Sequence, residues 1–243
     1  MAYQLSFKSY GEHAILIEWP KLISEDILKD VLRFKSSIEY SDVTNIEEVR
    51  SAYNSLLLVY SHLEKDVQDE VDLLIKIYNS DTISSTSKAK LWKIPVCYDA
   101  HFGIDLEAIS ETKKMTIGDI VKFHSEAVYT VYFIGFLPGF LYLGGLDEHI
   151  MMPRKSTPRL KIEQGSVAIG GDQTGVYPSA SPGGWNIIGN SPLNFFNIKK
   201  EEPCFAKAGD QIKFCPITLK EHADIKTLVD AQVYQLESEV IDG

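Results

Sequence analysis

The sequence predicts an α+β protein built from two small domains. A length of 243 residues is enough for two modest hydrophobic cores. Apolar residues in the first third switch between the two-residue period of strands and the 3.6-residue period of helices. The region from residue 153 to residue 216 holds several short β-prone runs separated by glycine, proline and other turn residues.

The first third predicts the element order ββαβα. Apolar and polar residues alternate over residues 5–7, and residues 14–19 are mostly apolar, so we expect two strands joined as a hairpin. Ser24 then caps a helix whose first turn is acidic, which suits the helix dipole. Residues 55–60 predict a further strand, and residues 67–78 place apolar residues at helical spacing.

A segment without apolar periodicity follows this first unit. Residues 79–90 are rich in Ser, Thr and Asp, which is typical of a linker or a long exposed loop. We therefore expect one domain over residues 1–85 and a second over residues 86–243.

The second domain is expected to begin with a mixture of strands and helices. Residues 91–97 predict a strand, and residues 106–109 lie in a helix. Thr116 followed by Asp119 resembles a capping box, so a second helix begins there. Residues 128–134 then predict a strand that leads into a glycine-proline loop.

The remaining residues predict a barrel or a sandwich of short strands. The expected strands are 166–169, 186–188, 193–198 and 211–214. The tail from residue 221 onward predicts a short helix.

Composition and charge exclude several classes of protein. No run of about 18 apolar residues is present, so no membrane span is expected. The first residues show no secretory pattern, so the expected location is cytoplasmic. A net charge of −10 opposes non-specific binding to nucleic acid. Cys97, Cys204 and Cys215 are widely spaced without a C-x-x-C pair, which argues against a disulfide framework and a zinc site.

The stretch from residue 135 to residue 189 has the composition of a binding site. Glycine, proline and aromatic residues gather in residues 135–140 and again in residues 181–185. Between them lie three cations, Arg154, Lys155 and Arg159, two of which follow a proline directly. Fixed turns that present guanidinium groups predict a polar surface that recognises anions.

These motifs resemble the family that contains the PxpB component of 5-oxoprolinase, KipI and allophanate hydrolase subunit 1. The matching residues are Ile94-Pro95-Val96-Cys97-Tyr98, Gly103, Asp105-Leu106, the run from Gly135 to Leu143, Pro153-Arg154, Pro158-Arg159, Gly165-Ser166-Val167, Gln173, Tyr177-Pro178 and the run from Ser181 to Trp185. The resemblance implies a small α+β N-terminal domain of ferredoxin-like type, followed by a cyclophilin-like β-barrel of carboxyltransferase type.

The resemblance also implies an activity and partners. Together with an A-type subunit and a homologous C-type subunit, such a chain couples hydrolysis of ATP, as Mg-ATP, to opening of the lactam 5-oxo-L-proline, which gives L-glutamate. ATP is expected as a cosubstrate because the lactam amide is a poor electrophile until its oxygen is phosphorylated. No motif locates the ATP site, since Gly170-Gly171-Asp172 lacks the Gly-Lys-Ser/Thr ending of a phosphate loop, and no protein-bound metal is expected.

Eleven residues are candidates for substrate binding or for an interface with a partner protein. They are Phe136, Pro138, Gly139, Tyr142, Arg154, Arg159, Gln173, Tyr177, Gly183, Gly184 and Trp185. The arginines, with Lys155 as a weaker candidate, are expected to hold a carboxylate or a phosphorylated intermediate. The glycine-proline runs have a second interpretation as tight turns of the barrel, and Trp185 has one as a core residue.

No residue is a firm candidate for the general acid or base. His124 has a side chain whose ordinary pKa suits a general base. Its neighbours on the predicted helix are apolar, however, which is more typical of a packing residue. The catalytic residues therefore stay unidentified at this level.

Two alternatives to a component of the enzyme are compatible with the resemblance. A KipI-type member inhibits a sporulation histidine kinase by binding to it. A cyclophilin-like barrel also allows prolyl isomerisation, although a fold does not determine a function. Two positions depart from the family pattern: Leu141 replaces a small residue or proline, and Asn190 replaces a common arginine, which removes a positive charge.

Overall fold

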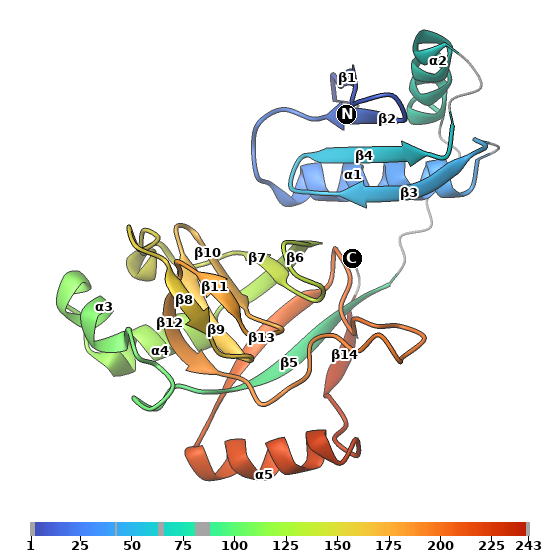
Figure 1. Ribbon diagram of the computed structural model, residues 1–243. Helices are drawn as coiled ribbons and strands as arrows, with labels where there is room; N and C mark the ends of the chain where they lie inside the picture. The colour runs from blue at the N-terminus through green and yellow to red at the C-terminus, as the bar shows by residue number, and fades with distance from the viewer. Residues whose placement is uncertain (1–2, 42, 63–65, 81–87, 242–243) are drawn as a thin grey trace. The chain divides into compact units, whose positions relative to one another are not determined.

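The computed structural model describes residues 3–41, 43–62, 66–80 and 88–241. These residues divide into two compact units, 3–80 and 88–241, and each unit is described by itself. Residues 81–87 of the expected linker, and with them the expected boundary between residues 85 and 86, lie outside the described residues. Figure 1 labels the α-helices and strands of both units.

The N-terminal unit is a four-stranded antiparallel sheet with two helices. Its elements in chain order are β1 (Ser6–Ser9), β2 (Ala14–Glu18), α1 (Glu25–Glu39), β3 (Ile46–Ser51), β4 (Ser55–Tyr60) and α2 (Val67–Tyr78). The strand order is β1-β2-β4-β3. The expected hairpin of β1 and β2 is confirmed, and Ser24 caps α1 by accepting a hydrogen bond from the Ile27 N–H.

The expected order ββαβα lacks one strand, because the structure has ββαββα. The strand that the sequence did not predict is β3, whose sequence Ile-Glu-Glu-Val-Arg-Ser is half charged and largely exposed. As an edge strand, β3 buries little, so its residues show weak apolar periodicity. A ferredoxin-like domain has the order βαββαβ, and that expectation is not confirmed.

The second unit is a closed barrel of seven strands. They are β5 (Ala89–Cys97), β6 (Val128–Ile134), β7 (Leu141–Gly144), β9 (Ser166–Gly170), β10 (Gln173–Val176), β12 (Asn186–Asn190) and β13 (Gln211–Ile217). Their order is β12-β9-β10-β7-β6-β13-β5, and pairing of Asn190 with Cys97 closes the circle. All neighbouring strands are antiparallel except β5 and β13. The barrel fits a cyclophilin-like fold.

Three further strands lie outside the circle. Strand β14 (Ser238–Ile241) pairs with β5, and β8 (Arg159–Ile162) pairs with β11 (Ser181–Gly183) in a separate ribbon. The ribbon lies on the outer surface of the barrel, because Ile162 of β8 packs with Ala168 of β9 and Ile187 of β12. These two barrel residues point outward, since their neighbours in the strands belong to the interior cluster.

Helices cover the barrel at several places. They are α3 (Leu106–Lys113), α4 (Ile117–Glu126), the short 3₁₀ helix η1 (Glu148–Ile150) and α5 (Leu219–Asp230). The expected capping box is confirmed, with Thr116 and Asp119 each accepting from the other's backbone N–H at the start of α4. In the part of the chain that the structure describes, no helix is both long and apolar enough to cross a membrane.

The expected strand over residues 193–198 is wrong. Leu193 and Phe195 are buried in alternation, as in a strand, and this alternation is the pattern that the sequence showed. The backbone nevertheless forms turns, and the Asn197 N–H donates to the Pro203 carbonyl instead of to a neighbouring strand. The two side chains complete the interior cluster without adding to the sheet.

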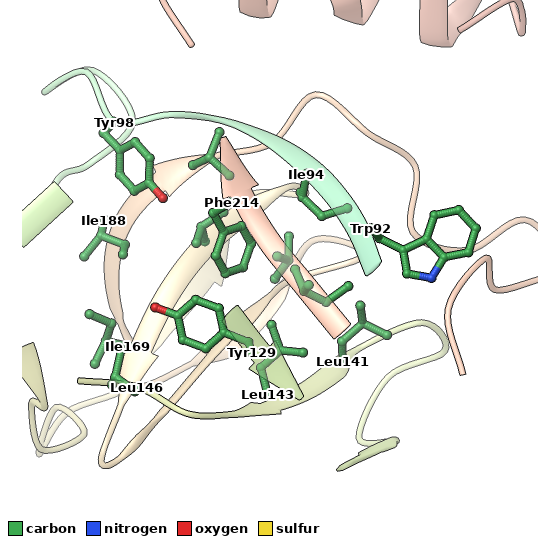
Figure 2. Packing of buried hydrophobic residues seen from close by; sticks show 14 of the residues in the cluster. Trp92, Ile94, Tyr98, Tyr129, Leu141, Leu143, Leu146, Ile169, Ile188 and Phe214 are labelled. Atoms are coloured by element: carbon green, nitrogen blue, oxygen red, sulfur yellow. The ribbon is translucent and has the colours of Figure 1, made fainter. Parts of the chain in front are cut away.

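The barrel interior is packed with apolar side chains from most of its strands. Figure 2 shows Ile94, Leu143, Ile169 and Phe214 meeting inside the barrel. All four have no exposed surface. The interior is therefore a core, and any site for a ligand has to lie at its ends or on its outer surface.

Candidate functional site

A buried carboxylate, Asp105, gathers two of the predicted cations. The Asp105 Oδ1 atom accepts from the Arg159 Nη2 atom at 2.7 Å and lies 2.8 Å from the Lys155 Nζ atom. Its Oδ2 atom accepts from the backbone N–H of Ile187 at 2.7 Å. Asp105 is only 3% exposed. It therefore ties the loop before α3 to the ribbon strand β8 and to the barrel strand β12.

The charges around Asp105 do not balance. Burial alone would raise the pKa of Asp105, but the hydrogen bonds from Arg159, Lys155 and the Ile187 N–H hold this pKa below its ordinary value. Asp105 is therefore ionised at neutral pH. One negative charge faces two positive charges, so the cluster keeps a local excess of positive charge in a chain of net charge −10.

Arg159 has a donor that nothing in the described residues satisfies. Its Nη2 atom binds Asp105, whereas its Nη1 atom is buried and has no hydrogen-bond partner among those residues. Leaving a buried donor unpaired costs about 1–3 kcal/mol. An oxygen atom brought to Nη1 by a bound molecule would remove this cost, which makes Nη1 a candidate donor to a ligand.

Arg154 adds a third cation next to an aromatic ring. Its guanidinium carbon lies 5.5 Å from the centroid of the Trp185 ring, which is a cation–π distance. Arg154 is exposed, and no carboxylate of the described residues forms an ion pair with it. Its hydrogen-bond donors are therefore open to an anion from solution.

Arg154, Lys155 and Arg159 make up a basic patch, and an aromatic cluster lies beside it. Phe140 lies at its centre, with ring centroids 5.0 Å from Tyr142, 5.4 Å from Tyr177 and 5.6 Å from Trp185. Trp185 is only 5% exposed, so it is a packing residue as well as a support for Arg154. The two interpretations of Trp185 are thus both compatible with its position.

The Tyr177 hydroxyl group lies against Gly183, the residue that pairs with Arg159 in the ribbon. The Trp185 N–H donates to the Tyr177 oxygen, and Arg154 and Arg159 both act to lower the Tyr177 pKa. Burial is the largest influence and leaves this pKa above its ordinary value. Tyr177 is therefore a neutral hydroxyl group in a positive environment.

Two of the predicted glycines, Gly183 in β11 and Gly184 directly after it, differ in what surrounds them. A Cβ atom at Gly183 would lie 2.3 Å from the Tyr177 hydroxyl oxygen, so any side chain there would displace Tyr177. A Cβ atom at Gly184 would make only ordinary contacts, and the Gly184 carbonyl accepts from the Lys155 N–H at 2.7 Å. Gly183 therefore permits close packing of Tyr177, and Gly184 fixes the backbone of the basic stretch.

The glycine-proline loop between β6 and β7 projects an aromatic ring. Phe136 is 64% exposed and has a φ of +65°, which is unusual for a residue other than glycine. Its ring makes an edge contact with Phe140 at 5.7 Å. Pro138 is exposed, whereas Gly139, at a φ of +83°, packs against Phe195 and Phe196. The loop thus places Phe136 next to the aromatic cluster, and Gly139 packs the loop onto the barrel unit.

Gln173 lies at the start of β10 and is half-buried. It pairs with Gly170 of β9, where a Cβ atom would overlap the Trp185 ring. No hydrogen bond from its side chain is found in the described ranges. Gln173 therefore lies near the aromatic cluster, because its strand partner Gly170 packs against Trp185. Its amide forms no hydrogen bond with the cations of the described residues.

Comparison with known proteins places this arrangement in a family. Residues 5–206 match the model of the carboxyltransferase domain, subdomain C and D. The B-type component of 5-oxoprolinase from Haemophilus influenzae is 47% identical over 204 residues, which are 84% of this chain and 94% of that protein. The chain belongs to this carboxyltransferase-domain family.

Solved structures agree with the family. The crystal structure of TTHA0988 has a TM-score of 0.73 and 26% identity, and it matches 84% of this chain. This chain spans 40% of the length of TTHA0988. The urea amidolyase of Kluyveromyces lactis has a TM-score of 0.81 over 98% of this chain, at 18% identity, which shows a shared fold. This chain spans 16% of that enzyme's length.

His124 does not belong to the basic patch of this family member. It has no exposed surface, and its Nδ1 and Nε2 atoms lie 2.7 Å from the Tyr98 hydroxyl and 2.8 Å from the Thr174 hydroxyl. Its ring stacks on Phe214 at 4.6 Å. Burial lowers the His124 pKa to about 3, so the ring is neutral at physiological pH. This geometry favours the packing interpretation over a general base.

A cavity of about 380 Å³ lies elsewhere in the barrel unit. It is lined by Leu193, Asn194, Asn197, Lys200, Glu202, Pro203, Phe205, Val229, Asp230, Gln232, Tyr234 and Leu236. None of the eleven candidate residues lines this cavity. Within the described residues, no group of three or more His, Cys, Asp or Glu side chains is placed to hold a metal ion.

Sequence reasoning missed the roles of Asp105 and Phe140. Asp105 precedes Leu106 at the start of a helix, so from sequence it resembles an N-cap. The structure gives it no capping hydrogen bond and turns its carboxylate toward Lys155 and Arg159 instead. The signal in the sequence was that the acidic Asp105 and the basic Arg159 both occur among the residues that match the family.

Proposed function

We propose that this chain is the B-type component of a 5-oxoprolinase complex, and that the complex opens 5-oxo-L-proline to L-glutamate with hydrolysis of ATP. The observation that supports this most is 47% identity, over 84% of the chain, to a protein named as the B-type component of 5-oxoprolinase. The family match over residues 5–206 extends into both units and includes all eleven candidate residues.

The chemistry of the patch agrees with such a substrate. 5-Oxo-L-proline is a small ring with one carboxylate. Arg154 and the free Nη1 atom of Arg159 are suited to the carboxylate, because guanidinium groups form short, charged hydrogen bonds with planar oxyanions. Trp185, Phe140 and Phe136 offer apolar surface to the ring carbons.

In this proposal the energy of ATP hydrolysis activates the lactam. A resonance-stabilised amide is a poor electrophile, and transfer of a phosphoryl group to its oxygen creates a good leaving group there. No glycine-rich run of this chain ends in Lys-Ser or Lys-Thr, as a phosphate loop does. We therefore assign the binding of lactam to the patch on this chain and leave the ATP site to the assembled complex of this chain with its A-type and C-type partners.

Reconstitution tests the proposal. The purified chain is mixed with its cognate A-type and C-type partners, each is omitted in turn, and glutamate released from 5-oxoproline is measured with and without ATP. We expect glutamate only from the complete mixture with ATP. Glutamate released equally without this chain would contradict the proposal. Partners that associate and yet release no glutamate would indicate a different amide substrate, and failure to associate would favour the KipI-type, kinase-binding alternative.

A further inference from the structure

We propose that Asp105 is a positioning residue: it fixes Arg159 and Lys155 so that the free Nη1 edge of Arg159 receives an oxyanion of the ligand. The inference rests on the proposed function for the identity of the ligand, a small lactam carboxylate. It assigns a role to a residue that does not itself contact that ligand.

The first step of the argument is the rigidity of Asp105. Both of its carboxylate oxygens are engaged, one by two cations and the other by the Ile187 N–H. Ile187 belongs to the barrel wall, whereas Arg159 belongs to the ribbon that packs on it. Because the buried Asp105 carboxylate is bonded to the backbone of the barrel wall, it holds the end of the Arg159 side chain in one position.

The second step is the direction in which Arg159 faces. A guanidinium group is planar, so binding of Nη2 to Asp105 fixes where Nη1 points. The Nη1 atom is buried without a partner in the described residues, so it is a directed donor for an oxyanion. The Tyr177 hydroxyl oxygen lies against Gly183, which pairs with Arg159 in the ribbon. Tyr177 and Arg159 therefore belong to the same part of the ribbon surface.

The third step is the charge. Asp105 is the partner carboxylate of both Arg159 and Lys155 among the ion pairs of the described residues. Without it, two cations would repel each other beside the exposed Arg154. With it, one positive charge remains in excess, which is enough to attract an anion while keeping the two side chains in place.

Binding measurements on the full-length chain test this role. The probes are 5-oxo-L-proline, 2-pyrrolidinone, which is the same ring without a carboxylate, and inorganic phosphate as a simple oxyanion. We expect Arg159→Ala and Asp105→Asn each to weaken binding of 5-oxoproline about tenfold, the effect of losing one charged hydrogen bond. Binding of 2-pyrrolidinone should not change. Asp172→Asn, which removes a carboxylate outside the Asp105 cluster, is the matched control and should bind as the wild type does.

The double variant separates positioning from a merely structural effect. If Asp105 acts through Arg159, adding Asp105→Asn to Arg159→Ala weakens 5-oxoproline binding no further. Losses that multiply in the double variant would overturn the inference, and so would unchanged binding in Asp105→Asn. If Asp105→Asn does not fold, Asp105→Glu makes the same test, because it keeps the charge and displaces it by one methylene. We expect weaker binding there too, and wild-type affinity would overturn the inference.

The same titrations distinguish the inference from the proposed function. If the chain does not bind lactams, 5-oxoproline binds no better than 2-pyrrolidinone, but phosphate binding still depends on Asp105 and Arg159. If the positioning role is wrong, 5-oxoproline binds and is hydrolysed in the reconstituted complex, with an affinity that Asp105→Asn does not change.

Discussion

Two buried polar clusters in the barrel unit differ in whether they are complete. In the first, His124 lies between Tyr98 and Thr174, and the Thr174 hydroxyl donates onward to the Ala168 carbonyl at 3.0 Å. Since the Thr174 proton is used there, the His124 Nε2 atom donates to Thr174, and Nδ1 accepts from Tyr98. Every donor in this chain of hydrogen bonds has an acceptor, and no group is charged.

The second cluster, formed by Asp105, Lys155 and Arg159, is charged and unfinished. It has an excess of positive charge and one buried donor without a partner among the described residues. A complete, neutral network stabilises a fold and has nothing to offer a ligand. An incomplete one is less favourable until a ligand arrives. Whether a cluster is complete therefore separates structural from binding residues better than residue type does. By residue type alone, His124 would be the candidate general base, although its network is complete.

The largest effect should come from acid on the His124 network. The folded state takes up the His124 proton only near pH 3, whereas unfolded histidine takes it up near 6.5. The unfolded state thus binds more protons between these values, and stability falls as the pH is lowered through them. From pH 7 to pH 4 the wild type should lose about 3 kcal/mol more than His124→Gln.

Urea unfolding measures this difference in a Trp19→Phe background, where Trp92 and Trp185, both in the barrel unit, report on that unit. His101→Gln, which alters an exposed histidine, is the control. If His124→Gln and the wild type lost the same stability on acidification, the His124 network would not be a neutral structural device.

Next in size is the loss of activity in Arg159→Ala. Removing the charged hydrogen bond to the ligand should lower glutamate release by the reconstituted complex at least roughly tenfold, which corresponds to about 1.5–3 kcal/mol. Lys161→Ala removes an exposed cation from the same strand and should leave the rate unchanged. Equal rates for Arg159→Ala and the wild type would remove Arg159 from the site.

Tyr98→Phe should lower stability and leave activity per folded molecule unchanged. It deprives the buried His124 Nδ1 atom of its donor, and an unsatisfied buried acceptor costs about 1–3 kcal/mol of stability. Urea unfolding should detect this loss, while glutamate release per folded molecule stays at the wild-type level. A fall in turnover without a fall in stability would connect the His124 network with the reaction.

The smallest effect concerns the exposed loop. Phe136 adopts a φ of +65°, which costs a residue with a side chain about 1 kcal/mol relative to glycine. Phe136→Gly should therefore be more stable than Phe136→Ala by about that amount in urea unfolding, since both lack the ring. If the Ala variant is as stable as the Gly variant, the loop does not hold position 136 in this conformation.

The sequence alone predicted elements that bury a regular stripe of apolar residues or begin with a local capping motif. The strand at residues 128–134 and the helix cap at Thr116 were predicted as the structure has them, because strong apolar periods and capping chemistry are local signals. The exposed edge strand β3 and the turns at residues 193–198 were not. Strand β3 buries little and so lacks a clear apolar period, whereas the turns bury Leu193 and Phe195 in the alternation of a strand.

The site was predictable only in part. Arg154 and Arg159 were candidates from sequence, and the structure places Arg154 over the Trp185 ring and bonds Arg159 to Asp105. Asp105 lies 54 positions before Arg159 in the chain, so no local pattern could pair the two residues. Composition can locate the cations of a binding site, but the residue that fixes them becomes visible only when the fold brings it next to them.

The most direct test of this account measures two quantities on two variants. Arg159→Ala and Tyr98→Phe are compared with the wild type for glutamate release by the reconstituted complex and for the urea midpoint of the barrel unit. The account predicts that Arg159→Ala loses activity per folded molecule, and that Tyr98→Phe loses stability and keeps its activity per folded molecule. If both variants lost activity per folded molecule, or if both kept it, the distinction between the complete and the incomplete cluster would be contradicted.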